Sequence, residues 1–195
     1  DVLGSRGLGD VYKRQGQQII MTKWAGAAGA AELAYVNKRS LMKYFPAVYV
    51  DEAVEYLWEK TAGESLLSIE KEIKTAWDMG AGAFHNVTKN GVFGALWEMA
   101  EMSHAGLEVN FAAIPVRQES IEICEQYGVN LYETDSLGSV LIGAEHGEDL
   151  VRRLREEGIP AAIIGRVTDG NDRTICRGEE TRSVSYTHLR AHETL

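Results

Sequence analysis

The sequence predicts an α/β sandwich, in which a mixed β-sheet is flanked by helices. Three observations support this fold class. Short apolar runs typical of buried strands recur along the chain, helical stretches of about ten residues alternate with them, and glycines such as Gly80, Gly128 and Gly158 close several of those helices. With 45% apolar and 25% charged residues, the 195-residue chain has the composition of a protein that buries a sizeable core.

The expected strands are short runs that are either continuously apolar or alternate in polarity. The run Ser139–Gly143 (SVLIG) is apolar throughout, so we expect it to be buried on both faces. The full set of expected strands is 18–22, 83–85, 107–111, 139–143, 161–167 and 173–177.

The expected helices follow from capping residues and from apolar positions at helical spacing. Asp51 is expected to cap one helix and Ser68 the next, and other helices are expected over 26–44, 91–103, 119–127 and 148–157. The side chains expected to be buried are Leu33, Val36, Leu41 and Met42 in the first helix, Val54, Leu57 and Trp58 after Asp51, Ile69, Ile73 and Trp77 after Ser68, and Leu150, Val151 and Leu154 in the last.

Composition excludes several functional classes. The net charge of −9 argues against a nucleic-acid partner, because proteins that bind phosphate backbones need a basic face. No apolar run is long enough to cross a bilayer, and we expect no membrane partner. The two cysteines, Cys124 and Cys176, form neither a CxxC pair nor a zinc-ligand pattern, which favours packing roles and a cytoplasmic location.

The two ends of the chain do not resemble the rest. Residues 1–15 and 183–195 match back-translated transposon and adapter sequence of sequencing libraries, and we call them the adapter-like ends. Such segments are excluded from fold reasoning. The natural sequence is therefore expected to span residues 16–182 as one domain, with no catalytic or metal role for the histidines of the tail.

One segment combines the residue types of an anion site. A strand ending in His85 leads into a polar turn over 86–90 that contains Asn86, Thr88 and Lys89, and Gly91 opens an apolar helix. Free amides at the helix N-terminus, the threonine hydroxyl and the lysine ammonium together suit a phosphate. The alternative is that Thr88 or Asn90 merely caps the helix and His85 is a satisfied residue at a strand end.

Two further segments carry candidate binding residues. Arg117 precedes a helix and has the fork geometry to hold phosphate or carboxylate, or else it pairs with a neighbouring acid such as Glu122. Ser136, Gly138 and Ser139 precede the most apolar strand and either line a site or form an ordinary connection. The chain has no Walker lysine motif, GxSxG elbow or HExxH pair, so no nucleophile or metal ligand set is evident.

The order of these segments resembles the carboxy-terminal domain of the AIR synthase (PurM-like) superfamily. Within it, the sequence is most similar to the AIR synthase-related proteins that include the hydrogenase maturation factors of the HypE type. The blocks that carry the resemblance are 20–26 (IMTKWAG), 85–88 (HNVT), 94–98 (GALWE), 114–125 (IPVRQESIEICE), 137–139 (LGS) and 163–168 (IIGRVT).

The resemblance implies a PurM C-terminal-domain-like fold paired, in a longer protein, with an amino-terminal domain. That domain is expected to supply most of the residues that bind ATP and Mg²⁺ and to form the interface of a homodimer. The shared reaction activates an amide-type oxygen by phosphoryl transfer from ATP, and HypE-like members dehydrate a carbamoylated cysteine at their own carboxy terminus. Other hydrogenase maturation proteins are the implied partners, and this chain alone is expected to be inactive.

Two departures bear on that activity. The turn usual in the family is HDxTxGG, whereas Asn86 replaces the aspartate here and Asn90 replaces the first glycine. The first change weakens a metal-ligand role and the second restricts close approach of a phosphate. The alternative function is a non-catalytic paralogue of the same fold that binds a nucleotide or another ligand. The sequence does not choose among the other substrates of the superfamily, which include selenide, thiamine phosphate and purine intermediates.

Overall fold

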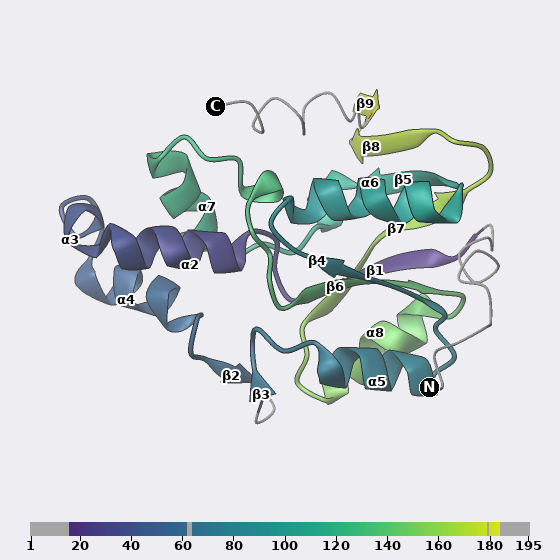
Figure 1. Cartoon of the computed structure of the whole chain (residues 1–195), viewed down its shortest axis with the longest axis horizontal. Coiled ribbons are helices and arrows are strands. Elements are labelled where there is room, and N and C mark those ends of the chain that lie inside the picture. The colour runs from purple at the N-terminus through teal and green to yellow at the C-terminus, as the bar shows by residue number, and fades with distance from the viewer. Residues whose placement is uncertain (1–15, 62–63, 179, 184–195) are drawn as a thin grey trace.

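The computed structural model describes residues 16–61, 64–178 and 180–183, and most of both adapter-like ends lies outside them. A seven-stranded sheet with the order β4-β6-β1-β7-β5-β8-β9 forms its centre (Figure 1). Only β5 and β8 pair in parallel among these strands, so the sheet is mixed. The strands are β1 (Gln18–Thr22), β4 (Ala83–Val87), β5 (Gly106–Asn110), β6 (Ser139–Ala144), β7 (Ala161–Thr168), β8 (Arg173–Arg177) and β9 (Glu180–Ser183).

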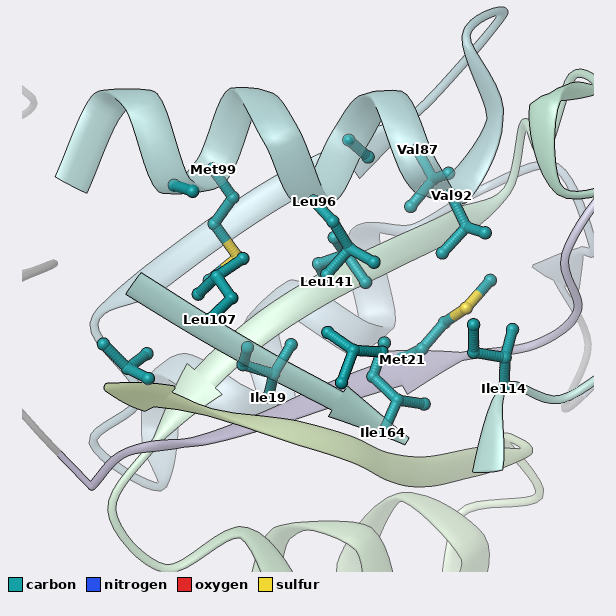
Figure 2. Close-up of a cluster of buried hydrophobic side chains, with 14 of the residues drawn as sticks. Ile19, Met21, Val87, Val92, Leu96, Met99, Leu107, Ile114, Leu141 and Ile164 are labelled. Carbon is teal, nitrogen blue, oxygen red and sulfur yellow. The ribbon is translucent and has the colours of Figure 1, made fainter. Parts of the chain in front are cut away.

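Helices cover both faces of this sheet. Helix α6 (Gly91–Ser103) lies on one face, where Leu96 and Met99 pack against Ile19 and Leu141 (Figure 2). Neighbouring residues of a strand point to opposite faces, so Ile20 faces the other side, where α5 (Glu70–Asp78) and α8 (Gly147–Glu156) pack. The predicted fold class is confirmed.

A second group of helices extends from the end of β1, on the left of Figure 1. Helix α2 packs against α4 and α7, and Ala34, Val50 and Ile123 are fully buried between them. A short hairpin links this group to α5. The remaining elements are α2 (Ala27–Val36), α3 (Lys38–Leu41), α4 (Ala47–Glu55), α7 (Gln118–Gln126), β2 (Lys60–Thr61), β3 (Glu64–Ser65), and the 3₁₀ turns η1 (Phe111–Ala113) and η2 (Leu131–Glu133).

All the expected strands are present, within three residues at each end. Strand β6 is buried at every position, as its continuous apolar sequence predicts. Helix α6 has the predicted bounds, and α8 buries the predicted Leu150, Val151 and Leu154.

The helix predicted over 26–44 is wrong, because it breaks at Asn37. The Asn37 side-chain amide and its backbone N–H both donate to the carbonyl of Leu33, which closes α2 and directs the chain into α3. Leu41 is fully buried and Leu33 half-buried, as predicted, but Val36 and Met42 are exposed.

Asp51 does not cap a helix. Helix α4 begins one turn earlier, after the extended Pro46, and Asp51 lies in its middle, where it forms an ion pair with Lys38. Val54 is buried and Leu57 half-buried, whereas Trp58 is exposed.

The buried face of α5 also differs from the predicted stripe. The prediction that Ser68 caps this helix is wrong, because the N-cap of α5 is Ile69 and no side chain caps it; the Ser68 hydroxyl, one residue earlier, accepts a hydrogen bond from the Glu70 amide. The helix, however, buries Glu72, Thr75 and Ala76, while Trp77 is exposed. Ile69 and Ile73, at its edge, are half-buried.

Candidate functional site

The 131–139 loop crosses the N-termini of α2 and α6 and so brings the candidate residues together. A Cβ atom added at Gly91, which has φ +63°, would overlap the backbone of Tyr132 and Glu133. Gly26 and Gly29 of α2 approach the same loop equally closely. The glycines at these two helix starts are therefore required by packing against the loop.

Ser136 and Ser139 connect this loop to the start of α2. The buried Ser136 hydroxyl accepts a hydrogen bond from the Gly26 amide (2.8 Å) and donates to the carbonyl of Thr134. Ser139 donates to the carbonyl of Trp24. Gly138 has φ +95°, and a Cβ there would overlap the carbonyl of Leu66. Both hydroxyls have partners within the chain, so their evident role is to position α2.

The turn after β4 is held to the same loop through its backbone. The Thr88 carbonyl accepts hydrogen bonds from the amides of Gly91 (2.9 Å) and Ser136 (3.4 Å). Asn90 is the N-cap of α6, but no side chain caps this helix end, so the interpretation of Thr88 or Asn90 as a side-chain cap is wrong. Thr88 and Lys89 are exposed beside first-turn amides that have no acceptor within the helix.

His85 belongs to a polar group at the edge of this turn. Its Nε2 lies 2.9 Å from a carboxylate oxygen of Glu98 on α6, and the other oxygen accepts a bond from the Asn90 side chain at 3.4 Å. Asn86 is exposed at the end of β4. The asparagine that replaces the first glycine of the family turn therefore bonds to α6, next to the exposed Lys89.

Arg117 is the N-cap residue of α7 and lies beside Trp24. Its guanidinium stands over the rings of Trp24 and Tyr56, at 5.2 and 5.5 Å from their centres, and pairs with Glu119 and Glu59. The prediction that Arg117 pairs with a neighbouring acid is therefore confirmed, but the acid is not Glu122. The Glu122 carboxylate accepts a hydrogen bond from the Gln118 side chain instead. Arg117 joins α7 to the segment after α4.

Sequence reasoning missed the buried ion pair of Lys23 and Glu72. The Lys23 ammonium lies 2.6 Å from the carboxylate and donates to the carbonyls of Leu66 and Ser68. Lys23 also has φ +55°, an uncommon conformation for a residue with a side chain. The only sequence signal is a charged residue directly after a buried strand, which is normally read as exposed.

The electrostatics of the buried groups indicate packing rather than activated nucleophiles. Burial raises the pKa of Cys124 to about 11, so its thiol is protonated at neutral pH. Burial also raises the pKa of Tyr56, partly opposed by the nearby Arg117, and the Tyr56 hydroxyl has no hydrogen-bond partner in the described part of the chain. The predicted packing role of Cys124 is confirmed, and Cys176 is half-buried beside Thr181.

Among residues 16–61, 64–178 and 180–183, no cluster of three or more histidine, cysteine, aspartate or glutamate side chains is arranged to hold a metal ion. Across the same ranges, no helix has the length and apolar character required to span a membrane.

Curated proteins similar to this chain include a PurL subunit and a HypE protein. One is the phosphoribosylformylglycinamidine synthase subunit PurL of Methanopyrus kandleri, which is 27% identical over 177 residues, or 88% of this chain and 22% of the relative. The other is the carbamoyl dehydratase HypE of Rhodobacter capsulatus, which is 29% identical over 91 residues, or 45% of this chain and 27% of the relative.

Solved structures show the same fold at lower identity. E. coli HypE, a hydrogenase maturation protein, superimposes with a TM-score of 0.67 at 19% identity over 90% of this chain. HypE in complex with ATP (TM-score 0.66, 21% identity) and the HypE–HypF complex (0.64, 22%) each match 88% of it. This chain spans about half of each matched chain, 51% to 53%.

A family model matches most of the chain. Residues 14–176 fit the model described as AIR synthase related protein, C-terminal domain, and the matched range includes β1, β4, α6 and the 131–139 loop. The chain therefore belongs to the family of AIR synthase related protein C-terminal domains.

Proposed function

We propose that this chain is the carboxy-terminal domain of a HypE-like, ATP-dependent enzyme that activates an amide-type oxygen by phosphoryl transfer. The observation that supports it is the family match over residues 14–176, together with the 29% identity to a carbamoyl dehydratase over 91 residues. Because the chain spans about half of the HypE structures, the activity belongs to the longer protein.

HypE has been solved in complex with ATP, which supports ATP as a cofactor of that longer protein. We propose Mg²⁺ as its second cofactor from the family resemblance. The turn after β4 fits one phosphate group: Lys89 and Thr88 are exposed there, beside the first-turn amides of α6. ATP would supply the phosphoryl group that activates the substrate oxygen. We assign most of the triphosphate and metal contacts to an amino-terminal domain.

The same similarity supports a place in hydrogenase maturation. HypE has been solved together with HypF, and we therefore propose a partner of that kind. From the family resemblance we also propose a cytoplasmic location and a homodimer formed by the amino-terminal domains. Asn90, bonded to Glu98 where the family has glycine, favours the second candidate, a paralogue that binds a nucleotide without turning it over.

Phosphate titration of this chain, followed by the amide chemical shifts of residues 87–93, tests the site. We expect millimolar binding, which corresponds to about −4 kcal/mol. Lys89→Ala should weaken phosphate binding several-fold, because a charge-assisted hydrogen bond to the phosphate is lost. Such a bond contributes about 1.5–3 kcal/mol before the cost of ordering the turn is subtracted. Thr88→Ala should weaken it without lowering stability, since this hydroxyl caps no helix. Lys43→Ala, at an exposed lysine elsewhere, is the control.

Shift changes near Arg117 or Ser136 with silent amides at 87–93 would place the anion elsewhere and refute the assignment. ATP hydrolysis separates the two candidate functions. The longer protein should hydrolyse ATP with Mg²⁺ if it is the enzyme and only bind it if it is the paralogue, whereas this chain alone should not turn it over.

A further inference from the structure

The helix group formed by α2, α3 and α4 carries an unusual share of the exposed apolar surface. Of the eleven large apolar side chains that are exposed in the described part of the chain, six lie within residues 35–58: Tyr35, Val36, Met42, Tyr44, Val48 and Trp58. Val36 is 78% exposed, more than any of the others. Large apolar side chains gathered in this way on a soluble protein are typical of a binding surface.

Three of these side chains line one hollow at the break between α2 and α3. The hollow has a volume of about 590 Å³ and is lined by Tyr35, Val36 and Met42 together with Asn37, Lys38, Arg39 and Ser40. The Tyr35 ring makes an edge contact with Trp58, with 5.8 Å between the ring centres. The Asn37 side chain, through its bond to the Leu33 carbonyl, fixes the break itself. Side-chain contacts with the rest of the helix group therefore shape this hollow.

The lining of the hollow is basic, although the chain as a whole is acidic. Lys38 and Arg39 line it and no carboxylate does, whereas the net charge of the chain is −9. Lys38 pairs with Asp51 of α4, but among the described residues Arg39 pairs with no carboxylate. Glu32, one turn earlier on α2, is exposed but does not line the hollow. A partly apolar hollow with an unpaired guanidinium is complementary to a negatively charged, partly apolar ligand.

We propose that this hollow binds an acidic peptide segment of another protein. An aliphatic or aromatic side chain of that segment inserts between Tyr35, Val36 and Met42, and a neighbouring carboxylate pairs with Arg39. The apolar contact supplies most of the affinity, because those side chains lose their exposure to water. The guanidinium supplies selectivity, since it binds a carboxylate through two parallel hydrogen bonds.

Shape and charge argue against other occupants. A bilayer surface is flat and attracts clusters of about four to eight basic residues, whereas this surface is concave and its lining has two. Nucleic acid would be repelled by a chain with a net charge of −9. A second copy that bound through the same hollow would bring the Arg39 side chains of both copies into one contact, where their charges repel.

A random peptide library displayed on phage and selected on the immobilised whole chain tests the proposal. We expect enrichment of sequences that place an aliphatic or aromatic residue beside aspartate or glutamate. In anisotropy titrations of the enriched peptide, Arg39→Glu should weaken binding at least about tenfold, because attraction becomes repulsion. Val36→Ser should weaken it several-fold, because an apolar contact is lost.

Each variant has a matched control outside the hollow. Lys74→Glu makes the same charge change at an exposed lysine of α5, and Val48→Ser makes the same apolar change at a valine of α4 that is 64% exposed. Neither should alter peptide binding. Circular dichroism identifies any variant that fails to fold. In that case the amide shifts of residues 35–42 in the wild-type chain decide, and they should move when the enriched peptide is added.

Several results would overturn the proposal. They are a selection without acidic sequences, peptide binding that Arg39→Glu and Val36→Ser leave unchanged, and amides at 35–42 that stay still. Binding to phosphatidylserine vesicles that the peptide does not displace would assign the surface to a membrane instead. A concentration-dependent dimer that Arg39→Glu abolishes, seen by analytical ultracentrifugation, would assign it to a second copy.

Discussion

Neutralising Glu72 should destabilise the protein far more than neutralising a carboxylate in an exposed ion pair of similar length. The side chains of Lys23 and Glu72 are 4% and 3% exposed and their charges are 2.6 Å apart. Glu72→Gln keeps the shape and one acceptor oxygen at this position. What is lost is the negative charge opposite an ammonium that has almost no contact with water.

The structure sets the size of the expected loss. Removing one partner of a buried pair typically costs about 3–5 kcal/mol, because the other charge stays buried without compensation. The Lys23 ammonium keeps the carbonyls of Leu66 and Ser68, so we expect the low end, about 3 kcal/mol. Replacing both residues by methionine should recover part of that loss, since no lone charge remains.

Urea unfolding of the chain measures these differences. The control is Glu108→Gln, because Glu108 pairs with Arg166 at 2.9 Å and their side chains are 43% and 60% exposed. That substitution should cost no more than about 1 kcal/mol. If Glu72→Gln costs no more than Glu108→Gln, the argument that burial makes the Lys23 pair critical is refuted.

The other predictions concern glycines, thiols and the chain ends. Gly170→Ala, at φ +84° in open space, should cost about 1–2 kcal/mol of unfolding free energy. Gly138→Ala should cost more than about 3 kcal/mol, because a Cβ there overlaps the Leu66 backbone in addition to the strained φ. If urea unfolding gives equal losses for the two substitutions, the role of Gly138 in packing against Leu66 is contradicted. A thiol reagent should modify the half-buried Cys176 in the native protein and reach Cys124 only in denaturant; equal rates would contradict the burial of Cys124. Deleting the adapter-like ends should leave the thermal midpoint nearly unchanged, and a loss above about 2 kcal/mol would show that they contribute to the fold.

Periodicity along the chain determined the strands and three of the helices, α6, α7 and α8. Strand β6 is buried at every position because it lies between two other strands in a sheet covered on both faces, and its apolar run is recognisable without its neighbours. Helix α8 has one apolar stripe, at Leu150, Val151 and Leu154, because only one of its faces packs against the sheet, and this spacing can be recognised from the helix alone. The candidate turn at 86–91 was also visible locally, as a strand followed by polar residues and an apolar helix.

Contacts between distant segments decided the rest. Local pattern placed Trp58 and Trp77 inside, yet both are exposed. In α5 the face turned inward is the one that carries Glu72, which is held by Lys23, 49 positions away in the chain. Ser136 resembled an ordinary loop residue, but its hydroxyl binds the Gly26 amide 110 positions away and positions α2. Sequence reports on a residue's immediate neighbours through propensity and spacing, whereas partners this remote exist only once the sheet has brought the segments together.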